Sequence, residues 1–146
     1  MVGRARPPHD APARLYEERA AGLIAMRVDE VAAEGGSRDA SARRREGERI
    51  QAKTIPQAWR VALDPAGRAP KGSPALARWL EKRLGAQRPL AFWVGGADGL
   101  DPGLVGDADE TLSLGPLTLP HQLARVVLAE QIYRALCVMR GHPYAR

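Results

Sequence analysis

The sequence predicts an α/β fold with a mainly parallel sheet and helices on both faces. Short apolar segments alternate along the chain with longer segments whose apolar residues recur about every three to four positions. Strands that alternate with helices form parallel sheets covered on both sides. The 146 residues suffice for one core and not for two, so residues 1–146 are expected to form a single domain.

The first half of the chain predicts two helices and two strands. Asp10, with Pro12 just inside, opens a helix, and residues 26–33 have the partial alternation of an edge strand. Residues 34–38 form a Gly-Gly loop, and a highly charged helix follows over about residues 41–53. Residues 59–64 alternate with period two, which is typical of a strand, and the loop after them extends to residue 72.

The second half predicts a regular alternation that ends in a long helix. Ser73 as N-cap and Pro74 at the first position start a helix that Gly85 ends. Residues 90–94, LAFWV, are continuously apolar, as in a strand buried on both faces. A short helix near 102–108, a strand at 111–114 and a helix over 121–139 complete the chain.

The helix expected over residues 121–139 has two apolar stripes, whereas a surface helix needs one. The members of the two stripes are Leu123, Val126, Val127 and Tyr133, and Ala124, Leu128, Ile132, Ala135, Leu136 and Met139. Two stripes predict that the helix packs on its own sheet and on a second copy of the chain, in a homodimer. The alternative is a helix sunk in its own core.

Composition narrows the class of protein. The net charge of +5 favours a polyanionic partner without identifying one. The single cysteine excludes an internal disulfide and suits a reducing cytosol, and no segment resembles a membrane span or a signal peptide. The three histidines lack the spacing of metal ligands. We therefore expect a soluble cytoplasmic protein with no metal and no membrane partner.

Three predicted strands end in glycine-containing loops, at residues 63–67, 94–99 and 114–120. Ligands of open α/β sheets bind beyond the carboxyl ends of the strands, and glycine lets the backbone approach a ligand closely. Together the loops predict a nucleoside-type pocket with few charges. The alternative is that these glycines only turn the chain.

Three sequence motifs carry a resemblance to a known family. GGADGLDP (95–102), LSLGPLTLPHQLARVVLAEQIYRA (112–135) and GHPY (141–144) resemble the bacterial 23S ribosomal RNA methyltransferases that act on N3 of a pseudouridine. The resemblance is dense over residues 90–146 and looser over residues 1–89. That family belongs to the SPOUT class, whose α/β fold contains a trefoil knot.

The resemblance implies a homodimer that binds S-adenosylmethionine in the knot. The matching cofactor-binding positions are Leu63, Gly96, Gly115, Pro116, Leu117, Thr118, Leu119 and Pro120. It also implies that the substrate is helix 69 of 23S rRNA in the assembled 70S ribosome. The residues implied to bind and react with the target are His142, Tyr144 and Arg146 of the C-terminal tail, with His121 and Arg125 contacting the substrate.

The chain departs from the family pattern at two places. The family begins with a full strand before a Val-Gly pair, and here only Met1 precedes Val2 and Gly3. Either the start codon lies too far downstream or the protein tolerates a smaller sheet. We expect an unpaired sheet edge or an exposed apolar groove as a result. The second departure is Ala145, where the family commonly has a histidine.

The expected chemistry is methylation of a ring nitrogen. N3 of pseudouridine is an imide N–H and must lose its proton to be a good nucleophile. Arg146 or Arg125 beside the base would lower that pKa, and His142 or Tyr144 would take the proton. The alternatives are a non-catalytic RNA-binding relative, or a SPOUT methyltransferase that acts on tRNA.

Overall fold

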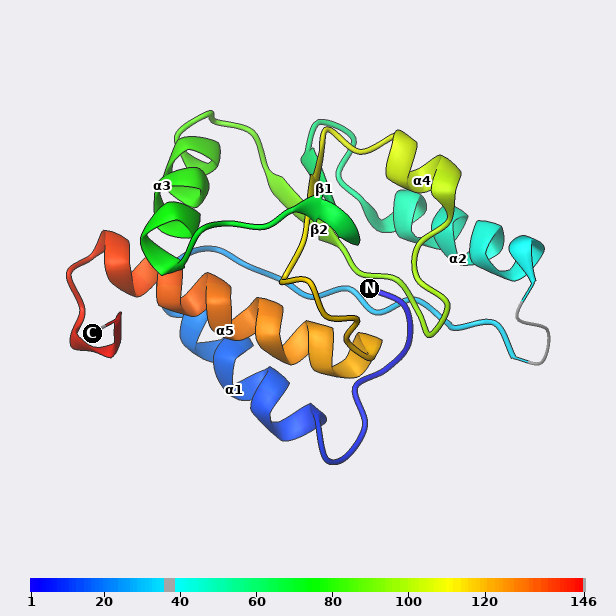
Figure 1. The fold of residues 1–146 in the computed structure, drawn as a ribbon, viewed down its shortest axis with the longest axis horizontal. Coiled ribbons are helices and arrows are strands. Elements are labelled where there is room, and N and C mark those ends of the chain that lie inside the picture. The colour runs from blue at the N-terminus through cyan, green and yellow to red at the C-terminus, as the bar shows by residue number, and fades with distance from the viewer. Residues whose placement is uncertain (36–38, 146) are drawn as a thin grey trace.

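The computed structural model describes residues 1–35 and 39–145. Five α-helices, three strands and a 3-10 helix occur in these residues (Figure 1). In chain order they are α1 (Asp10–Ala21), α2 (Ala40–Lys53), β1 (Trp59–Arg68), α3 (Ser73–Leu84), β2 (Leu90–Trp93), α4 (Pro102–Gly106), β3 (Glu110–Leu112), α5 (His121–Met139) and η1 (Pro143–Ala145). The alternation of strands and helices confirms the predicted α/β class.

The three strands form one parallel sheet in the order β2-β1-β3. Ala62 in the central strand lies opposite Trp93 of β2 and Thr111 of β3. The carboxyl ends of all three strands therefore meet at one edge of the sheet. The predicted ligand site at the three glycine-containing loops requires this arrangement.

Helices cover both faces of the sheet, because strand side chains alternate between two apolar clusters. Leu90 and Phe92 of β2 pack against the cluster formed with α1, α3 and α5. Trp93 joins Ala62 and the buried residues of α2 and α4 on the other side. Figure 1 shows α1 and α5 on one side of the strands and α2 and α4 on the other.

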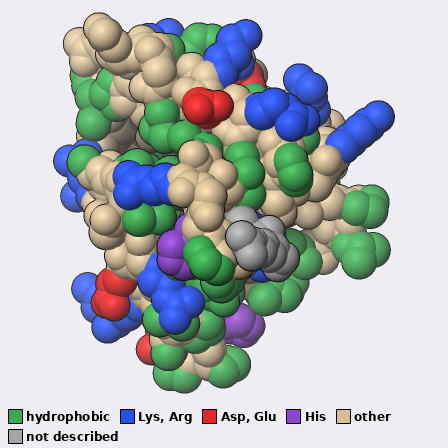
Figure 2. Space-filling view, turned by 90° about the vertical axis from the view of Figure 1, so that its left-hand side faces the viewer, with side chains coloured by type: hydrophobic (Ala, Val, Ile, Leu, Met, Phe, Trp, Pro, Cys, Tyr) green, Lys and Arg blue, Asp and Glu red, His purple; other side chains and the backbone are tan. Residues whose placement is uncertain are grey.

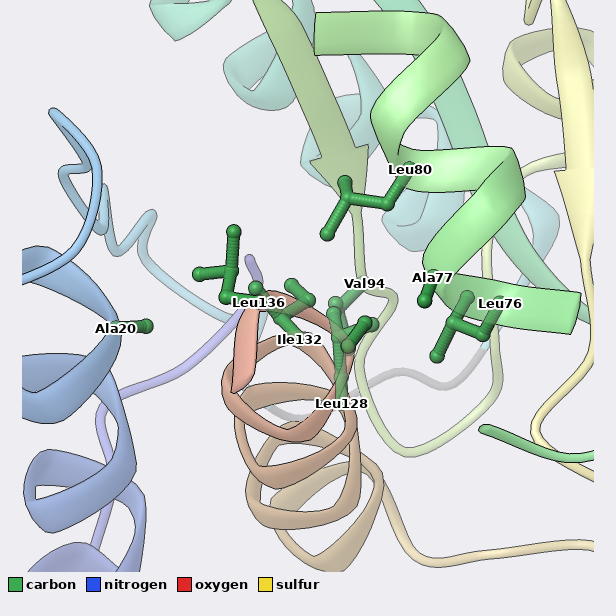
Figure 3. Packing of buried hydrophobic residues seen from close by; sticks show 9 residues of the cluster. Ala20, Leu76, Ala77, Leu80, Val94, Leu128, Ile132 and Leu136 are labelled. Carbon is green, nitrogen blue, oxygen red and sulfur yellow. The ribbon is translucent and has the colours of Figure 1, made fainter. Parts of the chain in front are cut away.

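The larger cluster is the core of the molecule, and α5 runs through it. Leu128, Ile132 and Leu136 of α5 point toward Leu80 of α3 and Val94 after β2 (Figure 3). Leu80 and Leu136 are 2% and 1% exposed, and burial of each such side chain contributes about 1.5–3 kcal/mol. This apolar stripe of α5 is therefore satisfied within its own chain.

The first residues of the chain take a strand-like position beside β2. The N–H of Val2 donates to the carbonyl of Val94 at 3.0 Å. The N–H of Gly3 donates to the carbonyl of Val31, and the N–H of Val31 donates to the carbonyl of Met1, each at 2.9 Å. Val2 is 1% exposed. These hydrogen bonds hold the first residues against the chain just after β2 and against Val31.

Below Val2 the outer edge of β2 faces an apolar groove with a volume of about 590 Å³. Residues 24–29 form its opposite wall, and Leu128 and Ile132 of α5 form part of its floor. Val28 and Ile55 each remain 41% exposed beside it. The structure thus contains the exposed groove that the sequence led us to expect.

Two secondary-structure predictions are wrong. Residues 26–33 form no strand, because their only ladder contact is the isolated bridge between Val31 and Val2. The predicted loop after residue 64 is instead part of β1, which continues past a bulge until Arg68 pairs with Leu112. A Cβ on Gly67 would lie 2.8 Å from the carbonyl carbon of Leu112, so this close strand approach requires glycine.

Other bounds agree with the predictions or shift by a few residues. α5 has its predicted bounds, 121–139, and the strand and short helix around residues 102–114 are shorter than predicted. The N-cap of α3 is Gly72, with φ +82°, and Ser73 is the first residue inside the helix. The Gly-Gly loop predicted at 34–38 lies partly outside the described residues.

Candidate active site

The loop between β3 and α5 presents backbone groups at the carboxyl edge of the sheet. Ser113 is 3% exposed, and its hydroxyl donates to the carbonyl of Gly115 at 2.8 Å. Gly115 has φ +145°, and an added Cβ there would meet no atom within 4 Å. Glycine is needed at this position for its backbone conformation rather than for space. Leu117 at the tip of the loop is 78% exposed.

This loop forms one wall of a cavity of about 400 Å³. Gly115 and Pro116 are the predicted cofactor-binding residues that line it, and Leu117 through Pro120 follow on the exposed continuation of the loop. The remaining walls are mostly apolar side chains of α3, β2 and α5, among them Leu76, Trp79, Phe92 and Val127, with the polar side chain of Gln131 beside them. A cavity of this size with few polar side chains fits a small organic ligand.

The sequence did not single out the cavity's other walls. Trp79 and Phe92 lie with their ring centroids 6.0 Å apart and form the aromatic side of the cavity. The relevant sequence signal is their position, since Trp79 belongs to the apolar stripe of α3 and Phe92 to the continuously apolar β2. That pattern indicates core packing equally well, so it does not distinguish a residue that lines a cavity from one that is buried in the core.

The other two predicted loops lie beside the cavity and do not line it. Leu63 pairs with Leu112 in the β1–β3 ladder, directly before the β3–α5 loop. Gly96 is buried, and a Cβ there would lie 3.1 Å from the Glu46 carboxylate and from Val2. Gly96 therefore has a packing role against α2 and the N-terminal residues.

The first turn of α5 lies against the N-terminal segment. His121 is half-buried, and a Cβ on Gly3 would be 3.7 Å from its Nε2 atom. The side chain of Gln122 donates to the carbonyl of Arg4 at 2.8 Å and accepts from the N–H of Arg6 at 3.2 Å. His121 thus lies where the β3–α5 loop enters α5.

Arg125 is directed into the molecule. It is 7% exposed and donates to both carboxylate oxygens of Glu17, at 2.6 and 3.0 Å, and to Glu30 at 2.5 Å. Burial acts to lower the pKa of Arg125, but its two carboxylate partners raise that pKa overall. The guanidinium therefore joins α5 to α1 and to the segment after α1, and this arrangement does not present it to RNA.

The C-terminal tail folds back onto α1 and α5. Gly141 turns the chain with φ +64°, and the N–H of His142 donates to the carbonyl of Cys137 at 2.9 Å. His142 is exposed, whereas Tyr144 is half-buried and its hydroxyl lies 3.0 Å from a carboxylate oxygen of Glu130. Arg146 lies outside the described residues.

The β3–α5 loop leads into one end of α5, and the tail follows the other end. The helix has 19 residues, which corresponds to a length of about 28 Å. Figure 1 shows the loop from β3 entering one end of α5 and the chain terminus folded against the other end. The tail folds back along α5 as far as Glu130, which accepts a hydrogen bond from Gln131 at the wall of the cavity.

The surface at the tail end is basic. Figure 2 shows Lys and Arg side chains spread over this face, with few Asp or Glu side chains. Among the described residues, no group of three or more His, Cys, Asp or Glu could hold a metal ion, and no helix is long and apolar enough to cross a membrane.

The parallel sheet, the backbone-rich loop and the cavity beside it define the class of α/β proteins that bind a small organic ligand at the carboxyl ends of their strands. Residues 1–145 match the family model described as "Predicted SPOUT methyltransferase". The chain belongs to this family of methyltransferases.

Curated relatives match almost the whole chain. A protein of Gluconacetobacter diazotrophicus named "Ribosomal RNA large subunit methyltransferase H" is 47% identical over 146 residues, covering 99% of this chain and 93% of the relative. Relatives with the same name from Gemmatimonas aurantiaca and Mesorhizobium japonicum are 45% and 40% identical, each covering 99% of this chain and 95% of the relative.

Proposed function

We propose that this protein uses S-adenosylmethionine to methylate large-subunit ribosomal RNA, at N3 of a pseudouridine in helix 69 of 23S rRNA on the assembled 70S ribosome. Its membership of the SPOUT family and the names of its relatives support a methyltransferase of ribosomal RNA. The observation that carries the proposal is the β3–α5 loop, whose backbone lines a cavity of about 400 Å³. The position and the base follow from the resemblance of the motifs at 95–102, 112–135 and 141–144.

The residues around the cavity fit the cofactor. The backbone of Gly115 and Pro116 offers hydrogen-bonding groups, and the side chains of Leu76 and Phe92 offer apolar walls for a flat ring. We assign Leu117, Thr118, Leu119 and Pro120 to the same site, because a leucine that is 78% exposed at the tip of a loop gains from being covered. When bound, the cofactor supplies an electrophilic methyl group on a sulfonium.

The other two cofactor-binding predictions have different geometric support. Leu63 adjoins the loop through its pairing with Leu112 and remains part of the proposed site. Gly96 faces Glu46 and Val2, so its contribution is to hold the neighbouring turn in place. We propose that the family's trefoil knot forms around these strand ends.

We propose that the active enzyme is a homodimer in which the tail of one subunit completes the site of the other. The arrangement follows from the family resemblance and from the exposed position of His142 beyond the C-terminal end of α5. Leu123 and Val126 of α5 stay half-exposed, which leaves apolar surface for a second copy. A two-fold axis brings the two ends of neighbouring helices together in both sites at once.

The tail then supplies proton handling and charge. His142 is the exposed imidazole of the tail, and an imidazole is suited to accept the N3 proton near neutral pH. A guanidinium at Arg146 would stabilise the deprotonated base. The His142 imidazole would take the N3 proton, and the deprotonated N3 would then accept the methyl group that a bound cofactor supplies. His121, at the entry of α5, is proposed to contact the RNA.

The direct test uses purified protein, ribosomes that lack the methyl group, and S-adenosylmethionine with a labelled methyl group. We expect label in 23S rRNA at the helix 69 pseudouridine and a strong loss of label with His142→Ala. His9→Ala is the matched control, because His9 lies outside the proposed site and should leave the rate unchanged. Absence of label with the wild-type protein would sink the proposed reaction.

Two further outcomes separate the alternatives. Calorimetry that detects no S-adenosylmethionine binding would favour a non-catalytic RNA-binding protein. Labelling of free tRNA in place of ribosomes would favour a SPOUT enzyme with a different RNA substrate. Both outcomes overturn the proposal, and each identifies what replaces it.

The dimer is tested by mixing two inactive variants, one altered at Gly115 and one carrying His142→Ala. A mixed dimer has one site with an intact loop and an intact tail. After exchange of subunits we expect about a quarter of the wild-type activity, because half of the dimers are mixed and each contains one working site. No recovery in a sample that exchanges subunits would show that loop and tail act within one chain.

A further inference from the structure

All three tyrosines of the chain meet at one place, the C-terminal end of α5. Tyr16 comes from α1, Tyr133 from α5 and Tyr144 from η1. The ring centroids of Tyr133 and Tyr144 are 4.8 Å apart, and those of Tyr16 lie 6.2 and 6.5 Å from the other two. These are distances at which aromatic rings attract one another. The tail is thus seated in an aromatic cluster.

Hydrogen bonds fix the Tyr144 hydroxyl within this cluster. It lies 3.0 Å from a carboxylate oxygen of Glu130 and 3.3 Å from the hydroxyl of Tyr16. Glu130 is itself held, since Arg134 donates to the same carboxylate oxygen at 2.9 Å. The Arg134 guanidinium also lies 5.0 Å from the centroid of the Tyr144 ring. One side chain of the tail therefore contacts α1 and three positions of α5.

The tail is anchored at two points with His142 between them. The first anchor is the turn at Gly141, closed by the hydrogen bond from the His142 N–H to the carbonyl of Cys137. The second is Tyr144. The N–H of Tyr144 also donates to Nδ1 of His142 at 3.2 Å, which orients the imidazole. His142 is exposed, so this arrangement presents it to solvent in a defined orientation.

We propose that Tyr144 is a positioning residue, and that its docking site on Tyr16, Glu130 and Arg134 holds the tail so that His142 is presented to the substrate. The consequence for the reaction rests on the proposed function. The docking site itself does not, because it is formed by contacts within one chain. Tyr144 then acts through His142 and does not itself receive the proton.

The ionisation of the phenol agrees with this role. Burial raises the pKa of Tyr144, and its hydrogen bonds to Tyr16 and Glu130 raise it further. A phenol next to a carboxylate donates its proton to a hydrogen bond and stays neutral. A neutral phenol is a poor acceptor for the proton of an imide. The exposed imidazole of His142 is the better base in the tail.

The docking site is tested without any activity assay, by following phenolate absorbance as the pH is raised. Since the chain has only these three tyrosines, the signal reports on this cluster alone. The pKa of Tyr133 is also raised, by its hydrogen bond with Cys137 and by burial, so Tyr144 is not alone in resisting ionisation. We expect Tyr144→Phe to remove the last ionisation step of the wild-type protein. Glu130→Gln should make that last step occur at lower pH, because the amide carries no negative charge to oppose the phenolate. Tyr133→Phe is the matched comparison and should retain the last step.

A titration in which Tyr144→Phe removes only an ordinary, early-ionising tyrosine would overturn the docking site. Thermal melts of each variant establish that it is folded at the pH values at which the absorbance is measured. Hydrogen exchange at the amides of residues 141–144 gives a second measurement. Exchange there should become faster in Tyr144→Phe and Glu130→Gln, and unchanged exchange would also contradict the docking site.

The positioning role is tested with ribosomes and labelled S-adenosylmethionine. We expect Tyr144→Phe to lower kcat several-fold, to leave the KM for S-adenosylmethionine unchanged, and to retain the pH profile of the wild-type enzyme. A proton acceptor removed by mutation costs about 10²–10⁴-fold in rate and changes the pH profile, and that result would overturn the assignment. If the wild-type protein is inactive while the absorbance titration behaves as expected, the proposed function fails and the docking site stands.

Discussion

Replacement of Arg125 by alanine tests whether this residue stabilises the fold or contacts RNA. The wild-type guanidinium makes two hydrogen bonds to Glu17 and one to Glu30, and the Arg125 side chain is 8% exposed. Arg125→Ala removes all three bonds and leaves two carboxylates facing each other across the space that the guanidinium filled. Uncompensated buried charges cost more than the ion pair itself contributes.

The magnitude follows from the burial of the partners. Breaking a buried ion pair by removing one partner costs about 3–5 kcal/mol. The side chain of Glu17 is 14% exposed and that of Glu30 is 31% exposed, so water offsets part of the cost at Glu30. We therefore expect a loss of about 3 kcal/mol, which for a domain of this size lowers Tm by roughly 10 °C. Arg125→Lys keeps the charge but loses the two-pronged contact with Glu17. Its Tm should lie between those of the wild-type protein and Arg125→Ala.

The loss should also depend on pH. Burial acts to raise the pKa of Glu30, but the hydrogen bonds from Arg125 and from the N–H of Ala5, together with the charge of Arg125, lower it below the ordinary 4.5. A carboxyl whose pKa is lowered on folding stabilises the protein above its unfolded pKa, and this contribution is lost as the pH falls through the folded pKa. The stability difference between the wild-type protein and Arg125→Ala should therefore shrink below pH 4.5.

The assay is thermal and denaturant unfolding, with ribosome binding measured well below the Tm of each variant. Arg44→Ala is the matched control, because its side chain is 78% exposed and pairs only with Glu48 on the same helix. That change should alter stability by less than about 0.5 kcal/mol. If Arg125→Ala has the same Tm as this control but loses ribosome binding, Arg125 is a substrate contact and the structural assignment is refuted.

Three further changes have defined outcomes. Gly67→Ala should lower Tm by several degrees, because its Cβ would lie 2.8 Å from the backbone of Leu112, whereas Gly106→Ala meets no atom within 4 Å and serves as control in the same melts. Burial, and then the charge of Arg125, lower the pKa of the Met1 ammonium below 8.0. Stability should therefore rise as the pH approaches 8, and acetylation of the N-terminus should abolish that rise in unfolding measurements. Gly115→Ala should weaken S-adenosylmethionine binding in calorimetry, because φ +145° disfavours a Cβ.

The sequence was sufficient to predict the parallel sheet and α5, because those features depend on apolar patterns that repeat within one segment. LAFWV is apolar throughout because Phe92 and Trp93 belong to clusters on opposite faces of the sheet. α5 has its predicted bounds because Pro120 precedes its first turn and Gly141 follows its last. The β3–α5 loop was predictable for a similar reason, since Gly115 reports a backbone requirement at its own position.

The errors arose where structure depends on contacts between distant segments. β1 continues to Arg68 because Leu112 provides a pairing partner, and the local sequence after Asp64 contains no sign of that partner. Residues 26–33 have a strand-like pattern but lie across a groove from β2, so they obtain a single bridge. The partners of Arg125 lie 108 and 95 residues away in the chain. Without knowledge of those partners, an arginine on a helix is predicted to face solvent.

α5 links these observations to function. Its first turn follows the cofactor loop, its middle fills the core between α1 and α3, and its last turns carry Glu130 and Arg134, which hold the tail. A shift of α5 relative to α1 would therefore move the tail and the cofactor loop together, and Arg125 resists such a shift through Glu17.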